Sequence, residues 1–229
     1  MELVVKQENE ITYLILNRPQ KRNALNKALV KALIEALREV KTHITVLQGA
    51  GEVFCAGMDL NEEIEEMGAL LCTLFKYLRE AHFLTIAFVH GAVVAGGIGL
   101  LACCDLVVAH ENTQFFLPEV HRGLVPALVM GLLYDKISPR LLADWMLTAR
   151  KFDVQEALSM HLIHRIGGEQ SLKNVIEELL KGAPQAQLST KKLLRQFSNE
   201  RLDAALKCYQ EVCKGKESKL RLAQFMPKQ

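Results

Sequence analysis

The sequence predicts an α/β fold, with a core of short strands and amphipathic helices followed by a helical C-terminal region. Short runs rich in Val, Ile and Leu recur through the first half of the chain, as in buried strands. Segments with apolar residues at helical spacing lie between these runs. Beyond about residue 116, strand-like runs largely disappear and helical patterns dominate. We therefore predict a core of ββα-like units over residues 1–166 and a helical region over residues 167–229.

The first half alternates between the two kinds of element. Pro19 closes the first strand-like run, because proline has no amide hydrogen for a strand ladder. Leu25, Leu29 and Leu33 begin an apolar stripe on one face of the first helix. The expected strands are residues 11–16, 44–47, 85–89 and 106–109. The expected helices are residues 24–40, 64–81 and 97–103.

The second half carries mainly helical patterns. Asp153, followed three residues later by Glu156, resembles a helix start with its capping residues. Trp145 lies in an amphipathic helical pattern and is predicted to belong to the core. One strand is expected at residues 162–166. Further helices are expected at residues 172–181, 185–196 and 202–212.

Composition argues against several classes of protein. The 229 residues carry a formal net charge of +2 with the basic residues spread along the chain, so no nucleic-acid partner is expected. No apolar stretch reaches the roughly 18 residues of a membrane span. The N-terminus also lacks the features of a secretory signal, so we expect a cytoplasmic protein without a membrane partner. The six cysteines form no CxxC pair and are expected to be reduced and mostly buried.

Two glycine-containing turns are candidates for an anion-binding site. Residues 90–99 follow a predicted strand and open a helix, which leaves free backbone amides at a helix N-terminus. Residues 52–60 also follow a strand and offer a second exposed amide near Gly57 and Met58. Two amides that converge on one oxygen would form an oxyanion hole. A third segment places Glu119 among apolar residues, where burial would raise the pKa of its carboxyl group.

Other interpretations of these segments remain open at this point. Gly97, Gly99 and Ala102 fit a dinucleotide-binding pattern, with Glu119 at the distance of a ribose-binding acid, but this match leaves residues 52–60 unexplained. The glycines could also serve only for helix–strand packing. An isolated glutamate is by default a surface or salt-bridged carboxylate.

Several other side chains invite a functional interpretation. Cys55 could be a nucleophile, but no histidine lies at a motif distance, so a small core residue is the simpler interpretation. His161 and His164 are three residues apart but lack a third ligand, so no metal site is expected. His121 and Arg122 could contact a phosphate, assist as acids or form a polar loop.

In combination, the glycine turns and the glutamate segment resemble the crotonase (enoyl-CoA hydratase/isomerase) superfamily over roughly residues 2–166, and more weakly to the end. Each segment alone is unspecific, but the combination at these spacings is highly specific. The segments that carry the resemblance are Asn17-Arg18-Pro19, Asn23-Ala24-Leu25, Phe54-Cys55-Ala56-Gly57-Met58-Asp59-Leu60, His90-Gly91, Ala95-Gly96-Gly97, Cys104-Asp105-Leu106 and residues 118–126.

The resemblance implies a spiral of ββα units and a helical C-terminal trimerisation region, in a homotrimer or a hexamer. It also implies that the Met58 and Gly96 amides bind the oxygen of an acyl-CoA thioester and that Glu119 is the catalytic acid/base. The residues implied to line the coenzyme A path are Lys21, Arg22, Ala24, Ala56, Asp59 and Leu60. Residues 219–228 are a further candidate for holding coenzyme A. No cofactor is expected, since the coenzyme A thioester is the substrate, and fatty acid metabolism is the expected setting.

Gly99 is the main departure from the superfamily pattern, because hydratases of this kind usually have a second glutamate there. Hydration uses two carboxylates naturally, whereas double-bond migration needs only one base. We therefore favour an enoyl-CoA isomerase, with a hydratase that uses a non-standard second acid as the alternative. Thioester hydrolysis, decarboxylation and a catalytically degenerate acyl-CoA-binding protein also remain open. The candidate second acids are Glu62, Glu63, Glu65, His121 and Arg122.

Overall fold

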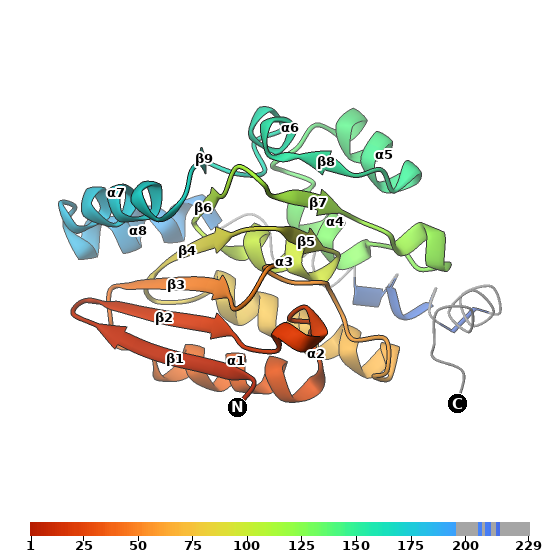
Figure 1. The fold of residues 1–229 in the computed structure, drawn as a ribbon, viewed down its shortest axis with the longest axis horizontal. Helices are drawn as coiled ribbons and strands as arrows, with labels where there is room; N and C mark the ends of the chain where they lie inside the picture. Colours follow the sequence, from red (N-terminus) through yellow and green to blue (C-terminus); the bar gives the residue numbers. More distant parts are fainter. Residues whose placement is uncertain (196–205, 208, 212–213, 216–229) are drawn as a thin grey trace.

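A six-stranded sheet forms the base of the fold (Figure 1). The structure is a computed structural model and describes residues 1–195, 206–207, 209–211 and 214–215. The strand order is β1-β2-β3-β4-β6-β9; the β1–β2 pair is antiparallel and the others are parallel. The strands are β1 (Leu3–Glu8), β2 (Ile11–Leu16), β3 (Ile44–Gly49), β4 (Leu84–Val89), β6 (Leu106–Ala109) and β9 (Arg165–Ile166).

The connections between strands explain this pairing. A two-residue turn, with Asn9 at a φ of 53°, joins β1 to β2. A connection this short can join only antiparallel strands. The helix α1 (Lys27–Glu39) then crosses from β2 to β3, and α2 (Ile64–Arg79) crosses from β3 to β4. Every residue of β4 is buried, as expected for a parallel strand that is covered on both faces.

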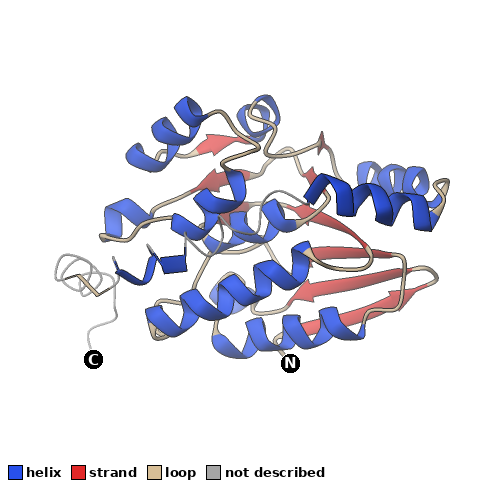
Figure 2. Cartoon of the chain, turned by 180° about the vertical axis from the view of Figure 1, so that it is seen from behind, coloured by secondary structure: helices blue, strands red, loops and turns tan. Residues whose placement is uncertain are grey.

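Helices cover both faces of this sheet. α1 and α2 run side by side across one face (Figure 2), where their buried residues belong to the larger of two apolar clusters. On the opposite face, Leu172 and Ile176 pack with Ile86 in a second cluster. Adjacent side chains of β3 point to opposite faces of the sheet, so Val46 packs in the second cluster and Leu47 in the first. Further helices are α3 (Gly96–Cys103), α4 (Ala127–Leu133), α7 (Glu169–Leu180) and α8 (Pro184–Arg195).

A smaller sheet carries the segment that leads to Glu119. Its strands are β5 (Ala92–Val94), β7 (Gln114–Phe116) and β8 (Phe152–Asp153), in the order β5-β7-β8. Trp145 packs edge-on against Phe152 with ring centroids 4.4 Å apart, and Phe152 stacks on Phe115 at 5.2 Å. This aromatic row holds β7 in place. The other helices are η1 (Pro19–Lys21), η2 (Glu119–Arg122), α5 (Pro139–Thr148) and α6 (Val154–Ser159).

The α/β prediction is confirmed, and most elements lie where the sequence places them. The strands expected in the first half correspond to β2, β3, β4 and β6, and the expected helices to α1, α2 and α3. α1 begins at Lys27 rather than at residue 24, because Asn26 caps it by accepting a hydrogen bond from the Leu29 amide at 2.9 Å. Asp153 caps α6 through the Glu156 amide, and Trp145 is fully buried, both as predicted.

Some elements were missed or wrongly bounded. No strand was expected over β1, β5, β7 or β8; β1 is largely exposed, and the other three are very short. The strand expected at residues 162–166 is wrong in length, because it is confined to Arg165–Ile166. The turn that follows α6 occupies the preceding residues, because the Leu162 amide donates to the Ala157 carbonyl at 2.9 Å instead of to a neighbouring strand.

The structure describes the C-terminal predictions in part. Of the helix expected at residues 202–212, residues 206–207 and 209–211 are described and helical. Residues 219–228 lie outside the described residues, as do Cys208 and Cys213. The described cysteines are free and buried, as expected: Cys55, Cys72, Cys103 and Cys104. No helix in the described part of the chain has the length and apolar character to cross a bilayer. The boundary at residue 166 stays a prediction.

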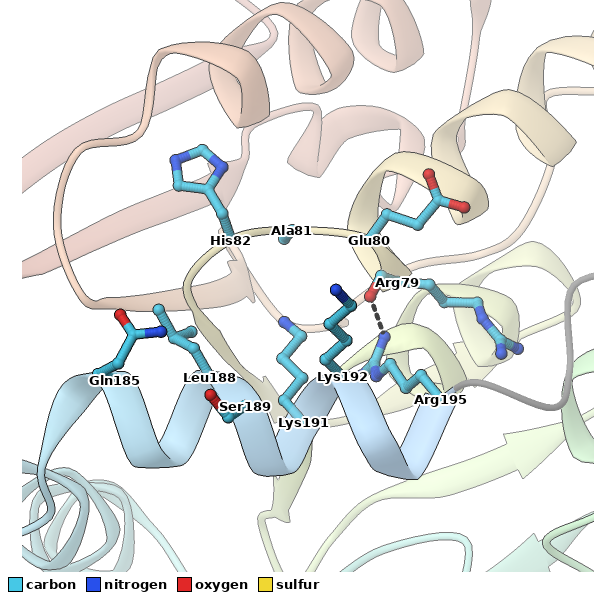
Figure 3. A pocket seen from close by; sticks show the side chains of 10 residues that line it. All are labelled: Arg79, Glu80, Ala81, His82, Gln185, Leu188, Ser189, Lys191, Lys192 and Arg195. Carbon is cyan, nitrogen blue, oxygen red and sulfur yellow. Dashed lines mark hydrogen bonds between the residues drawn. The ribbon is translucent and has the colours of Figure 1, made fainter.

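The partly buried carboxylate of Asp105 connects the C-terminal end of α3 to α8. Asp105 accepts hydrogen bonds from the Thr85 amide and hydroxyl, both at 2.8 Å. It also pairs with Lys191 at 2.9 Å and with Arg195 at 2.5 Å. Figure 3 shows both basic residues on the side of α8 that faces the end of α2, where Arg195 donates to the Arg79 carbonyl at 2.7 Å. Asp105 therefore neutralises charges that α8 brings against the sheet.

Removing this carboxylate is expected to destabilise the fold strongly. Asp105→Ala would leave Lys191, which is 7% exposed, without its buried counter-ion, at a cost of about 3–5 kcal/mol. Chemical denaturation measures this change. Glu178→Ala, which breaks an ion pair with Arg165 on the surface, serves as the control and should leave the midpoint nearly unchanged. Equal effects of the two substitutions would contradict a central role for Asp105.

Candidate active site

The first glycine turn is fixed beside the segment that precedes α1. Leu25 donates its amide hydrogen to the Gly57 carbonyl at 2.7 Å and accepts from the Asp59 amide at 2.9 Å. These two bonds form a parallel bridge centred on Met58. In such a bridge the amide of the central residue points to the opposite side of its chain. The Met58 N–H is therefore directed away from Leu25.

The Gly96 amide meets the Met58 amide on that opposite side. Gly96 is the first residue of α3, so its N–H has no partner within the helix. A Cβ built on Gly96 would lie 4.0 Å from the Met58 nitrogen, which shows how closely the two segments approach. Within the described part of the chain, neither amide donates a hydrogen bond to a protein acceptor. Two neighbouring unpaired amides, one of them at a helix N-terminus, are suited to stabilise a negatively charged oxygen.

The backbone around these amides is held in unusual conformations. Ala95, the N-cap of α3, has φ 50° and ψ −117°, a conformation that costs a non-glycine residue on the order of 1–3 kcal/mol. Hydrogen bonds from its amide to the Phe116 carbonyl (3.0 Å) and from the Ile98 amide to its own carbonyl (2.9 Å) maintain it. Gly57 has a φ of +87°, and a Cβ there would lie 2.8 Å from the Ala95 Cβ. Glycine is required at position 57 for both reasons.

Glu119 begins the 3-10 helix η2, after a two-residue link from the end of β7. Its Oε2 atom is buried and has no hydrogen-bond partner among the described residues. Burial raises the pKa of Glu119 to about 7, while its own backbone amide and the positive charge of Arg122 act in the opposite direction. The carboxyl group therefore exists in both protonation states near neutral pH, which suits it to proton transfer.

A largely apolar cavity brings these groups together. Met58, Gly96 and Glu119, which are far apart in the sequence, all line it. Its other described lining residues are Leu60, Leu71, Phe75, Ala95, Arg122, Leu124, Pro126, Leu128, Val129 and Tyr209. Among these described residues, Glu119 carries the sole carboxylate.

Phe75 occupies the space beside Gly99. A Cβ built on Gly99 would lie 2.4 Å from the Cζ atom of the Phe75 ring, far inside van der Waals contact. Any side chain at position 99 would therefore require the ring to move. An apolar ring thus stands where the superfamily pattern places a second carboxylate.

The predicted second acids lie elsewhere, with one exception. Glu62 accepts a hydrogen bond from the Lys27 amide at the start of α1, and Glu65 pairs with Lys214 at 3.6 Å. Neither these residues nor Glu63 and His121 are among the described residues of the cavity wall, whereas Arg122 is. No second carboxylate therefore reaches the cavity from the described residues.

The residues predicted to line the coenzyme A path gather around the first glycine turn. Lys21 and Arg22 are exposed, and the Arg22 carbonyl accepts from the Ala56 amide at 2.9 Å, which places Ala24 and Ala56 in neighbouring segments. Leu60 lines the cavity itself. Their contact with coenzyme A stays a prediction.

Asp59 and Arg18 form an ion pair that supports this turn. The Asp59 carboxylate accepts hydrogen bonds from Arg18 at 3.1 Å and from the Asn61 side chain at 2.9 Å. Burial alone would raise the pKa of Asp59, but the bonds from Asn61 and the charge of Arg18 together lower it. The Asp59 carboxylate is therefore engaged in hydrogen bonds with Arg18 and Asn61.

Asn23 is a supporting residue to which the sequence interpretation assigned no role. It is fully buried, donates to the carbonyls of Ala50 (2.8 Å) and Val53 (2.9 Å), and accepts from the Arg18 amide at 2.9 Å. These bonds hold the chain that enters the first glycine turn. The position of Asn23 at the head of the Asn23-Ala24-Leu25 motif, directly before its apolar residues, was the available signal. Phe75 and Tyr209 left no comparable local signal.

Other candidate residues have structural environments. Burial raises the pKa of the Cys55 thiol to about 12, which makes it unsuited to act as a nucleophile. His164 accepts a hydrogen bond from the Val107 amide at 3.0 Å through Nδ1. No group of three or more potential metal ligands occurs among the described residues.

Comparison with known proteins identifies the family. The family model described as enoyl-CoA hydratase/isomerase matches residues 6–224. The chain belongs to the enoyl-CoA hydratase/isomerase family. It is 34% identical to the enoyl-CoA hydratase AKT6-1 of Alternaria alternata over 96% of this chain and 80% of that protein.

Solved structures of the enoyl-CoA hydratase/isomerase family agree with this fold. An enoyl-CoA hydratase from Mycobacterium avium matches with a TM-score of 0.90 and 28% identity, over 98% of this chain and 95% of that one. An enoyl-CoA hydratase/isomerase from Pseudoalteromonas atlantica matches with a TM-score of 0.87 and 30% identity, over 98% and 96% of the two chains. The predicted superfamily and crotonase-like fold are confirmed, and the protein is an acyl-CoA enzyme of this family.

The raised pKa of Glu119 predicts a pH-dependent effect on the stability of this family member. The folded pKa of about 7 exceeds the ordinary value of 4.5, so the folded state retains a proton that the unfolded chain releases between these values. The stability contributed by this group is therefore complete below about pH 4.5 and is lost as the pH rises through 7. Glu119→Gln cannot ionise and should gain on the order of 2–3 kcal/mol relative to the wild type between pH 4 and pH 9.

Thermal or chemical unfolding of the two proteins across this pH range measures the difference. Glu111→Gln, at an exposed site, is the matched control and should track the wild type. A pH-independent difference between Glu119→Gln and the wild type would show that the carboxyl group has an ordinary pKa.

Proposed function

We propose that this enzyme moves the double bond of an enoyl-CoA thioester, using two backbone amides to stabilise the enolate and Glu119 as the single proton carrier. A thioester carbonyl makes the neighbouring carbon weakly acidic. Removal of a proton there places negative charge on the thioester oxygen. The N–H groups of Met58 and Gly96 would stabilise that charge through hydrogen bonds to the oxygen. Each such donor typically contributes about 100- to 1,000-fold to the rate.

Glu119 would remove a proton from one carbon and return it to another. A carboxyl group with a pKa of about 7 can act as base and as acid near neutral pH, because both forms are populated. The buried, unpartnered Oε2 supports this assignment, since a structural carboxylate in such a place would be expected to have a hydrogen-bond donor.

The single carboxylate in the described cavity wall is the observation that favours isomerisation. Hydration must deprotonate a water molecule at one carbon while a proton reaches the next, and two acid/base groups perform this naturally. Gly99 and the ring of Phe75 leave an apolar surface at the position of the second group. Double-bond migration does not require that group.

A coenzyme A thioester would reach the cavity past the first glycine turn. Lys21 and Arg22 are exposed there and could bind the phosphates, while Ala24, Ala56 and Leu60 would flank the thioester end. Asp59 would act through its ion pair with Arg18, which holds the turn in place. No further cofactor is needed for this chemistry, and a homotrimer or hexamer in the cytoplasm in fatty acid metabolism remains our expectation.

Hydration is the second candidate, because similar proteins such as AKT6-1 are named enoyl-CoA hydratases. In this case a group other than a second carboxylate of the described cavity wall would have to activate the water molecule. Assays of 2-enoyl-CoA hydration and 3-enoyl-CoA isomerisation on the same preparation distinguish the two reactions. Binding of acyl-CoA without either reaction would instead support a degenerate binding protein.

Glu119→Gln is expected to lower kcat for 3-enoyl-CoA isomerisation by at least about 1,000-fold, because the amide cannot accept the proton. Binding of a saturated acyl-CoA, measured by calorimetry, should survive, since the amide has nearly the same shape. Glu111→Gln is the control and should retain the wild-type rate. Full activity of Glu119→Gln would eliminate the proposed role.

A double substitution tests the part played by Phe75. Gly99→Glu alone should fold poorly, because its side chain would overlap the Phe75 ring. Combined with Phe75→Ala, it should fold and raise the ratio of hydration to isomerisation by at least about tenfold, since a second carboxylate then faces the cavity. Thermal unfolding and the paired assays give both readouts. An unchanged ratio in the folded double variant would refute the argument from the missing carboxylate.

A further inference from the structure

Two aromatic rings enter the cavity, and each lies over a glycine. A Cβ built on Gly99 would lie 2.4 Å from the Phe75 ring, and one built on Gly68 would lie 2.2 Å from the Tyr209 ring. Both rings line the cavity. The Tyr209 hydroxyl donates to the Ile64 carbonyl at 3.3 Å, which holds its ring against α2. The absence of a side chain at two positions therefore lets two large side chains occupy space beside the proposed reaction site.

The Phe75 ring stands at the closed end of the cavity. Met58 and Leu60, in the first glycine turn, are partly exposed and mark the side that is open to solvent. Phe75 is 1% exposed, and Leu128 and Val129 of α4, which line the same cavity, are also buried. An acyl chain whose thioester oxygen lies at the Met58 amide therefore ends against α2 and α4 when it enters this cavity.

The space that remains is small. The cavity has a volume of about 60 Å³, whereas sites that enclose a drug-sized ligand usually measure about 300–1,000 Å³. One water molecule needs roughly 10–15 Å³ of such space. The cavity therefore has room for about four to six groups the size of a water molecule or a methylene group.

We propose that Phe75 limits the length of the acyl group, so that the preferred substrates are coenzyme A thioesters with about four to six acyl carbons. This inference rests on the proposed function, because it takes the cavity as the acyl site. Gly99 then has two effects, since it removes a carboxylate and also admits the ring that shortens the cavity. Carbons beyond about the sixth must remain in water or displace buried side chains.

The alternative is that the Phe75 ring only packs α2 against α3. Loss of the ring would then weaken the fold without changing how binding depends on acyl length. An acyl site with spare room gains about fourfold in affinity for each additional buried methylene group. The ratio of affinities for a long and a short saturated acyl-CoA is therefore the decisive measurement, because the contacts with coenzyme A cancel in it.

The experiment compares decanoyl-CoA with hexanoyl-CoA by isothermal titration calorimetry on the full chain. Both acyl groups are saturated, so the proposed reaction converts neither ligand. Four more methylene groups would raise the affinity of an unobstructed site by about 200-fold. The wild type is expected to gain less than about tenfold. Phe75→Ala should increase the ratio of decanoyl-CoA to hexanoyl-CoA affinity by at least about tenfold, because it opens the closed end of the cavity.

Phe83→Ala is the matched control, since Phe83 is also fully buried but is not among the described residues of the cavity wall. It should keep the wild-type ratio. Phe75→Leu and Phe83→Leu form a gentler pair in which leucine keeps much of the packing, and the first should raise the ratio by about threefold. Thermal unfolding establishes which variants are folded.

Three results would overturn the proposal. The first is a wild type that binds decanoyl-CoA tenfold or more tightly than hexanoyl-CoA. The second is an unchanged ratio in a folded Phe75 variant. The third is an equal change in the corresponding Phe83 variant, which would assign the effect to lost packing.

A turnover assay separates this inference from the proposed function. The kcat/KM value of the wild type should be at least about tenfold higher for 3-hexenoyl-CoA than for 3-decenoyl-CoA, and Phe75→Ala should narrow the difference. If binding follows the expected dependence on length but neither 3-enoyl thioester is converted, the isomerase proposal fails while the length limit stands. Isomerisation of both substrates with equal kcat/KM values would overturn the length limit and leave the proposed function intact.

Discussion

The close approach of two chain segments at Gly57 and Ala95 is the constraint on which the candidate site depends. A side chain at position 57 would collide with the methyl group of Ala95, so the segments reach this distance only because one residue has no Cβ. Each segment is also held from its other side, by Leu25 in one case and by the Phe116 carbonyl in the other. The two amides thus keep their relative position without any ligand, which limits the reorganisation needed when charge develops on a bound oxygen.

The surrounding helices and strands place this contact in the wall of a cavity. α3 supplies an amide at its first residue, and the carboxylate of Asp105 follows its last turn and connects it to α8. The aromatic row from Trp145 to Phe115 steadies the strand that ends near Glu119. Three segments that are distant in the sequence therefore reach one apolar space, in which a carboxyl group loses water and its pKa rises.

The sequence was informative where a local pattern reports a local structure. Leucine spacing predicted α1, and the glycine turns and Glu119 stood out because their residue types and order are specific. Contacts between segments far apart in the chain could not be predicted in this way. The ring of Phe75, 24 positions before Gly99 in the sequence, belongs to a leucine-rich helix whose pattern suggests only burial. Short edge strands such as β8 likewise have too few residues to show a period.

The strained backbone conformation of Ala95 affects how much the amides of the site can move. A glycine there would adopt the same angles without steric cost, but it would also explore many others, since it lacks the methyl group that restricts rotation. The alanine therefore trades folding stability for a narrower conformational distribution at the start of α3. Together with the hydrogen bonds that the Ala95 backbone makes with Phe116 and Ile98, the methyl group limits the backbone angles available at this point, so the neighbouring amides keep a narrow range of positions.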